Sequence, residues 1–231
     1  MNIIVNGGTR GIGKQIVLAL AREKSNKILV TGRNNRILKQ LSSEAEHKNV
    51  TCVMIDLLKF ENQEKSFFTE VSLRMKTVEI LINTAGYHVV KDFMKLSSRN
   101  AREMMETNFF GPASMIRTLR PLMKEGAHIV NISSMGGYQG SVKFRGLSYY
   151  SASKAALSCL SECLAVEFSG TGISVNCLAL GAAQTEMFEK AFPGSQAPVT
   201  AAEMAEFIVD FALKGNKFFN GKVLPVAIGN P

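Results

Sequence analysis

Short apolar runs alternate along the whole chain with longer segments of helical periodicity, and this alternation constrains the fold more than any other feature. Between the first two runs, Ile12, Ile16 and Leu20 recur at the spacing of one helix face. The runs are continuously apolar, as strands buried on both faces of a parallel sheet require. They occur at residues 3–5, 28–31, 50–55, 79–82, 128–132, 173–178 and 223–227. The pattern predicts an α/β fold, doubly wound in three layers around a mostly parallel sheet of about seven strands.

We expect one domain over residues 1–231, because the chain has no linker, repeat or low-complexity segment. Hydrophobic residues make up 46% and the formal net charge is +8, which excludes a disordered chain. No run approaches about 18 apolar residues, and Met1–Val5 is too short for a signal peptide, so we expect neither a membrane span nor secretion. The cysteines form no C-x-x-C pair and the histidines are scattered, which predicts no metal site and a reducing, cytoplasmic setting. Cys159 and Cys163 would share a helix face, and we interpret them as packing residues rather than a redox pair.

A glycine-rich turn directly follows the first predicted strand and opens the first predicted helix. Glycines let the backbone approach a phosphate closely, and the free N–H groups at a helix start favour its negative charge. Gly8–Lys14 also fits the triphosphate-binding pattern G-x-x-x-x-G-K, but that pattern continues with Ser or Thr to hold magnesium, and this chain has Gln15. We therefore predict a Rossmann-type dinucleotide site with phosphate contacts from Gly7, Thr9, Arg10, Gly11, Ile12 and Gly13.

Residues after the third and fourth strands fit the same ligand. Asp56, followed by Leu57, stands where a carboxylate would accept a hydrogen bond from the adenine amino group. Asn83, Ala85 and Gly86 stand where small residues would let a flat cofactor lie close to the backbone. Each pair or triplet alone is also typical of an ordinary strand-ending turn. Their shared position at the carboxyl ends of parallel strands predicts one binding cleft.

The second strand ends at Thr31-Gly32-Arg33, without an acidic residue to grip a ribose 2′-hydroxyl. Arg33 would instead accommodate a 2′-phosphate, and Arg10 in the glycine-rich turn would reach the same group. Each arginine alone is typical of a solvated surface charge. Together with the missing carboxylate they favour NADP(H) as the cofactor.

Tyr150 and Lys154 are four residues apart at the start of a predicted helix, so they share one face. A free tyrosine has a pKa near ~10, and a nearby ammonium favours its phenolate. We therefore predict that Lys154 lowers the pKa of Tyr150 and makes it a general acid/base. Tyr149 has Ser153 at the same offset, which carries no charge, so Tyr150 is the better candidate.

Asn108 precedes Pro112 by four residues in the long helix expected to start near Ser97. Because proline has no N–H, the carbonyl of Asn108 loses its helical partner and is free to hold a water molecule. Gly-Pro kinks also occur for packing alone.

Together these residues resemble the short-chain dehydrogenase/reductase family, in its compact single-domain branch, similar to the 3-oxoacyl-carrier-protein reductase-like carbonyl reductases. The resemblance covers nearly the whole chain and adds Gly181 and Thr185 to the cofactor site. It implies that Tyr150 protonates a carbonyl oxygen or deprotonates an alcohol, while Ser134 hydrogen-bonds the same oxygen. It also implies that Lys154 binds the nicotinamide ribose and that a water held at Asn108 completes a proton relay.

The chain departs from the family pattern at three places. Asn6 stands where Thr is usual, and Leu180 stands where Pro usually precedes Gly181. The interval between Ser134 and Tyr150 is longer than usual, and Lys143–Gly146 is the expected insertion beside the substrate site.

A substrate lid is expected over residues 186–199, before a helix that starts at Thr200. Phe188 and Phe192 in this lid, with Tyr138 and Phe144, would wall a partly apolar pocket, or simply pack the lid. Scattered basic residues would attract an anionic substrate or an acyl carrier, although such residues also serve solubility; they are Lys91, Lys143 and Arg145.

We therefore expect an NADPH-dependent oxidoreductase that transfers a hydride between nicotinamide and a small-molecule carbonyl or alcohol. A non-catalytic dinucleotide sensor on the same fold is the alternative, although it has no need for Tyr150, Lys154, Ser134 and Asn108 together. No basic run interleaved with aromatics supports nucleic-acid binding. The family resemblance, with an apolar run in the helix from Ser148, predicts a homodimer or homotetramer.

Overall fold

In the computed structural model, which describes residues 1–228, seven parallel strands form one sheet. Their order is β3-β2-β1-β4-β5-β6-β9, so the direction of strand addition reverses between β1 and β4. The strands are β1 (Asn2–Asn6), β2 (Lys27–Gly32), β3 (Val50–Met54), β4 (Ile80–Asn83), β5 (His128–Ser134), β6 (Ser174–Leu180) and β9 (Val223–Val226). They agree with the predicted runs to within about two residues at each end. The doubly wound α/β fold is confirmed; residues 229–231 of the expected domain lie outside the described part.

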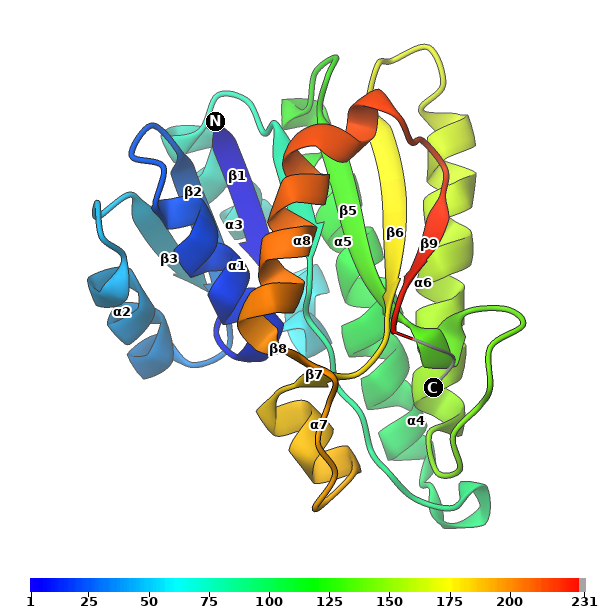
Figure 1. Ribbon diagram of the computed structural model, residues 1–231. Helices are drawn as coiled ribbons and strands as arrows, with labels where there is room; N and C mark the ends of the chain where they lie inside the picture. The colour runs from blue at the N-terminus through cyan, green and yellow to red at the C-terminus, as the bar shows by residue number, and fades with distance from the viewer. Residues whose placement is uncertain (229–231) are drawn as a thin grey trace.

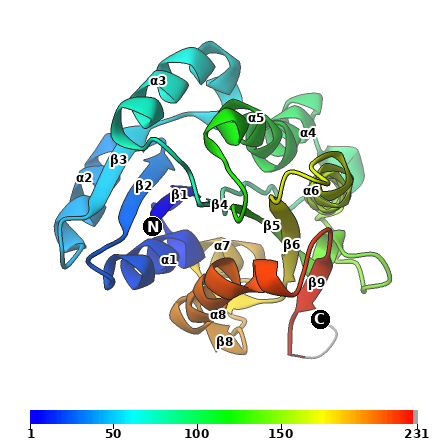
Figure 2. The ribbon, with the colours of Figure 1, turned by 90° about the horizontal axis from the view of Figure 1, so that it is seen from above.

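Helices cover both faces of this sheet, as Figures 1 and 2 show. In Figure 1, α1 and α8 lie in front of the strands and α3 and α5 lie behind them. The helices are α1 (Gly11–Ala21), α2 (Asn35–Glu44), α3 (Glu64–Arg74), α4 (Ser98–Met105), α5 (Gly111–Leu119), α6 (Ser148–Glu167), α7 (Glu186–Ala191) and α8 (Ala201–Lys214). Short 3₁₀ turns lie at Leu57–Asn62, Phe93–Lys95, Arg120–Leu122, Met135–Gly137 and Gly215–Lys217. Within residues 1–228, no helix combines the length and apolar character needed to cross a bilayer.

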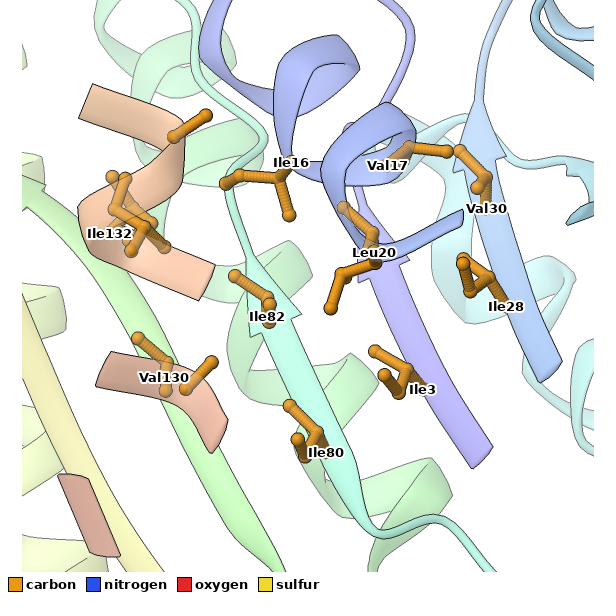
Figure 3. Packing of buried hydrophobic residues seen from close by; sticks show 14 of the residues in the cluster. Ile3, Ile16, Val17, Leu20, Ile28, Val30, Ile80, Ile82, Val130 and Ile132 are labelled. Atoms are coloured by element: carbon orange, nitrogen blue, oxygen red, sulfur yellow. The ribbon is translucent and has the colours of Figure 1, made fainter. Parts of the chain in front are cut away.

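Two hydrophobic clusters fill the spaces between the sheet and its helix layers. Successive strand residues point to opposite faces, so Ile3 and Val5 join one cluster and Ile4 joins the other. In the first cluster, Ile16 and Leu20 of α1 pack toward the sheet, as Figure 3 shows. Continuous apolar strands are therefore needed, because both faces of the sheet are buried.

A row of polar side chains crosses the sheet near the carboxyl ends of the strands. The residues occupy adjacent register positions on β2, β1, β4 and β5, namely Thr31, Asn6, Asn83 and Asn131. The Thr31 hydroxyl donates to Oδ1 of Asn6 (2.8 Å), whose Nδ2 donates to Oδ1 of Asn83 (3.0 Å). Asn83 donates to Asn131 (2.8 Å), which donates to the Ser161 hydroxyl of α6 (2.9 Å). We call these five side chains the polar row.

The long helix predicted from Ser97 does begin there, with a capping box between Ser97 and Asn100. It runs through a π-helical turn at Glu106–Phe110 into α5, where the Gly111 N–H donates to the Glu106 carbonyl. Pro112 occupies the first turn after this change, a place where its missing N–H does least harm.

The lid is a small folded unit rather than an open loop. Two short strands, β7 (Ala183–Gln184) and β8 (Val199–Thr200), pair in parallel and join its two ends, with α7 between them. The side chain of Gln184 accepts from the Ala197 N–H (2.8 Å) and donates to Glu189 (3.0 Å). Thr200 caps α8 through a capping box with Glu203.

Candidate active site

One cleft of about 1020 Å³ lies at the carboxyl ends of the strands, beside the point where the strand order reverses. The glycine-rich turn, the ends of β2 to β6, the start of α6 and the lid all contribute to its walls. This is the place where open α/β sheets bind their ligands.

The structure brings nearly all predicted site residues together in this cleft. Two are missing from the lining, since the side chains of Asn83 and Asn108 are buried beneath it. The predicted residues that line the cleft are Gly7, Thr9, Arg10, Gly11, Ile12, Gly13, Arg33, Asp56, Leu57, Ala85, Gly86, Ser134, Tyr150, Lys154, Gly181 and Thr185.

The glycine-rich turn depends on the absence of side chains. Gly7 has φ +89°, and a Cβ there would stand 2.5 Å from the backbone of Ala85. A Cβ on Gly13 would stand 2.4 Å from the Gly7 carbonyl oxygen. The tight turn leads into α1, whose N-cap residue Arg10 makes no side-chain capping bond, and the first turn of α1 holds no acidic residue. Its N-terminal amides and helix dipole are therefore available to an anion, which fits the pyrophosphate of a dinucleotide.

Arg10, in the turn after β1, and Arg33, directly after β2, both line the cleft, and both are exposed. Neither makes an ion pair with any residue in 1–228. Asp56 lies across from them at the end of β3, where one carboxylate oxygen accepts from the Leu58 N–H (3.2 Å). The two arginines can donate to a phosphorylated ribose, and the Asp56 carboxylate can accept from an adenine amino group.

Tyr150 lies in the cleft with the Ser134 hydroxyl beside it. Burial raises the pKa of Tyr150, and the Ser134 hydroxyl acts in the opposite direction. The sequence predicted that Lys154 lowers the pKa of Tyr150. The pKa is raised instead, because burial outweighs the other influences on the phenol. Tyr150 therefore holds its proton at neutral pH.

Lys154 lies one helical turn after Tyr150, and its Nζ donates to the Ile132 carbonyl at 2.8 Å. Burial lowers the pKa of Lys154 to about 8. Its backbone carbonyl accepts from the Ser133 hydroxyl (2.8 Å), which fixes this turn of α6 against β5.

Asn108 lies in the π-helical turn and is completely buried. Its Oδ1 accepts from the Tyr87 N–H (2.8 Å), and its Nδ2 donates to the Tyr87 carbonyl (2.8 Å) and the Ser153 hydroxyl (2.9 Å). The Ser153 hydroxyl donates to the Tyr150 carbonyl (2.7 Å). The side chain of Asn108 thus ties the segment after β4 to the first turn of α6, a role that the expected water-holding carbonyl did not suggest.

Several other predicted residues lie outside the cleft. Tyr149 stacks on Phe93, with ring centroids 5.6 Å apart, and Tyr138 lines a separate hollow of about 820 Å³. Lys143 donates to the Tyr138 carbonyl, and Arg145 pairs with Asp92 at 2.9 Å. Of the predicted aromatic wall, three residues line the cleft: Phe144, Phe188 and Phe192.

Sequence reasoning missed His88 and Lys190, two polar residues of the cleft lining. The end of the cleft that they share with Phe144, Phe188 and Phe192 is called the substrate end below. His88 stands two residues after Gly86, and Lys190 stands one helical turn after Glu186 in the lid. Their positions at a strand end and in the lid pointed toward the cleft, but neither residue belongs to a motif.

A family model described as short chain dehydrogenase matches residues 1–196. Carbonyl reductase family member 4 of Xenopus tropicalis is 32% identical over 186 residues, covering 79% of this chain and 75% of the relative. The 3-oxoacyl-[acyl-carrier-protein] reductase FabG of Aquifex aeolicus is 32% identical over 189 residues, covering 80% and 74%.

The similarity extends to solved structures. A dehydrogenase/reductase of Sinorhizobium meliloti superposes with a TM-score of 0.84 at 27% identity, covering 97% of this chain and 92% of that one. A short chain dehydrogenase of Shigella flexneri complexed with NADP has a TM-score of 0.87 at 23% identity, covering 97% and 95%. The chain belongs to the short chain dehydrogenase family of oxidoreductases.

Proposed function

We propose that the protein is an NADPH-dependent oxidoreductase that transfers a hydride between nicotinamide and a carbonyl or alcohol substrate, with Tyr150 as the general acid/base. One observation carries the proposal: Tyr150, Ser134 and Lys154 line the same cleft as the glycine-rich turn at the start of α1. A protein that only binds a dinucleotide would not require a proton donor such as Tyr150 in the same cleft.

The bound cofactor supplies the hydride. In the direction of reduction, the protonated phenol of Tyr150 donates its proton to the carbonyl oxygen, and the Ser134 hydroxyl hydrogen-bonds the same oxygen. Lys154, which lines the cleft one helical turn after Tyr150, would hold the ribose next to the nicotinamide. Asn108 acts as a positioning residue, since it orders the turn that carries Tyr150 through Ser153.

The preference for NADP(H) rests on Arg10 and Arg33, which line the cleft, and on the sequence Thr31-Gly32-Arg33 at the end of β2, which contains no acidic residue. The NADP complex of the Shigella relative supports it. The substrate is a small-molecule carbonyl or alcohol, as the names of the carbonyl reductase and reductase relatives suggest.

We also infer a cytoplasmic homodimer or homotetramer. The face of α6 turned away from the sheet exposes small or apolar side chains at Ala152, Ala155, Cys159 and Val166. Exposed small and apolar side chains on one helix suit a two-fold contact between copies of the chain.

Turnover tests the catalytic assignment. Wild-type protein and the Tyr150→Phe variant are assayed for NADPH oxidation with a panel of ketones, aldehydes and acyl thioesters. We expect Tyr150→Phe to lose about 10²-fold to 10⁴-fold in kcat with NADPH affinity unchanged, because only the proton donor is removed. Tyr149→Phe is the matched control and should retain turnover. NADPH binding by wild type without turnover of any substrate would favour the sensor alternative.

Cofactor choice is tested by binding. We expect NADPH to bind more than about tenfold tighter than NADH, and Arg33→Ala to narrow this difference. Arg36→Ala removes an exposed arginine of α2 that does not line the cleft, and it should leave the ratio unchanged. Equal wild-type affinities would overturn the NADP(H) assignment.

A further inference from the structure

The substrate end of the cleft has an apolar wall made from two separate segments. Phe144, from the segment before α6, packs edge-on against Phe192 of the lid, with centroids 5.6 Å apart. Phe192 also contacts Phe188 of α7 at 5.3 Å. All three rings line the cleft, so one side of a bound substrate would meet aromatic surface.

Two polar side chains, His88 and Lys190, line the same end of the cleft. The His88 ring lies edge-on to the Tyr150 ring, with centroids 6.0 Å apart and an interplanar angle of 73°. Burial lowers the pKa of His88, and the positive charge of Lys190 lowers it further. His88 is therefore neutral at pH 7, and Lys190 is close enough to affect it.

Lys190 has no acidic partner within residues 1–228. Glu186 shares its helix face, but the Glu186 Oε2 points to the glycine-rich turn, 3.8 Å from where a Cβ on Gly11 would stand. Glu189 accepts a hydrogen bond from Gln184. Lys190 is thus a cation in the cleft lining that is left for a ligand to neutralise.

We propose that the substrate end of the cleft binds carbonyl compounds that carry a carboxylate on an apolar body, with Lys190 pairing with the carboxylate and the aromatic wall holding the body. The inference rests on the proposed function, because that function places the substrate carbonyl at Tyr150. Lys190, rather than the predicted Lys143 and Arg145, is the specificity-determining cation, because those two are bound to Tyr138 and Asp92 outside the cleft.

The binding test uses 3-benzoylpropionate and its neutral amide, a matched pair with the same aromatic ketone. Their dissociation constants are measured by calorimetry with protein in saturating NADP⁺, for wild type, Lys190→Gln and Lys143→Gln. We expect the acid to bind about tenfold or more tighter than the amide in wild type and in Lys143→Gln. The preference should disappear in Lys190→Gln. Equal affinities of acid and amide in wild type, or undetectable binding of the acid, would overturn the inference.

A spectroscopic readout separates pairing at Lys190 from a general structural effect. A carboxylate bound at Lys190 offsets the positive charge that, after burial, lowers the pKa of His88, so an NMR titration should show that pKa rising with the acid but not with the amide. A His88→Gln variant assigns the resonance among the three histidines.

The inference and the proposed function fail in different ways. If wild type reduces neutral aryl ketones with NADPH but binds acid and amide equally, the carboxylate site is wrong and the reductase stands. If no carbonyl compound is reduced but the acid shows its Lys190-dependent preference, the reductase is wrong and the anion site stands.

Discussion

The two halves of the molecule build their parts of the cleft in different ways. Before β4, the phosphate-binding part of the site is made from backbone, since the turn at Gly7–Gly13 offers amides and leaves no room for side chains at Gly7 and Gly13. From β4 onward, the site is made from side chains that are themselves held by buried polar partners. The first half buries few polar side chains, namely Asn6, Asn26 and Thr31. The second half buries Asn83, Thr107, Asn108, His128, Asn131, Ser133, Ser153, Lys154, Ser158, Ser161 and Asn176.

This difference shows what each kind of site requires. A backbone site for phosphate needs only a chain conformation, and it is damaged by added atoms. A proton-transfer site needs particular groups in fixed positions, so its supporting polar atoms must all be satisfied, and it is damaged by removed atoms.

Gly7→Ala should give the largest effect, and Gly140→Ala is its matched control. Both glycines have positive φ, +89° and +84°, so both substitutions carry a backbone strain of about 1–2 kcal/mol. Only at Gly7 does the new Cβ also collide with backbone, whereas nothing lies within 4 Å of the Cβ position at Gly140. We expect Gly7→Ala to lower the free energy of unfolding by more than about 3 kcal/mol and to abolish NADPH binding. Equal losses in the two variants by denaturant titration would contradict a turn limited by close backbone contact.

Acid should destabilise the second half through His128, at the start of β5. Its Nδ1–H donates to the Ala212 carbonyl (3.0 Å), and its Nε2 accepts from Nδ2 of Asn176 (3.0 Å). The amide of Asn176 cannot turn to accept instead, because its Oδ1 accepts from the Lys222 N–H and its Nδ2 also donates to the Phe219 carbonyl. The site therefore suits only neutral imidazole, and burial lowers the pKa of His128 to about 4.

The pH window follows from the two states of His128. Between its ordinary pKa near ~6.5 and the folded value of about 4, the unfolded chain binds the proton and the folded chain does not. Stability is therefore lost as the pH falls through this window, by about 3 kcal/mol in total. The measurement is denaturant unfolding at steps from pH 7 to pH 4, with His128→Gln as control. A wild-type slope no steeper than that of the variant would show that His128 is not responsible.

Asn83→Ala tests whether the second half depends on hydrogen bonds between buried polar side chains. The change leaves Nδ2 of Asn6 without its acceptor and Oδ1 of Asn131 without its donor. We expect a loss of about 1–3 kcal/mol in unfolding free energy. NADPH affinity should change little, because the Asn83 side chain lies in the polar row and outside the cleft lining. A large loss of affinity at unchanged stability would instead make Asn83 a cofactor contact.

The same contrast explains what the sequence could predict. The strands, the turn at Gly7–Gly13 and the position of Tyr150 and Lys154 one turn apart on α6 depend on residues close together in the chain, and local spacing was enough to place them. The polar row depends on contacts between residues 77 and 48 positions apart, such as Asn6 with Asn83 and Asn83 with Asn131. Periodicity carries no information about such contacts between strands that are far apart in the sequence.

Two further errors have physical causes. The raised pKa of Tyr150 could not be predicted, since the distance to Lys154 is set by the helix but burial is set by the whole fold. The pairing of β7 with β8 at the two ends of the lid was not predicted, because strands of two residues leave no readable pattern in the sequence. His88 was missed because it belongs to no motif, and Lys190 was missed because the fold of the lid brings it to the cleft.

Arg145→Ala should have the smallest effect on the free energy of unfolding. Arg145 belongs to the second half, but its side chain is 89% exposed and its ion pair with Asp92 is surrounded by solvent. Exposed pairs contribute about 0–1 kcal/mol, because water screens the charges and the long side chain loses entropy when held. We expect a change in unfolding free energy below about 1 kcal/mol and an unchanged KM for carboxylate substrates. A marked rise in KM would mean that the segment before α6 moves over the cleft when substrate binds. The exposed charge of Arg145 would then contribute to the site, as the buried polar groups of this half do.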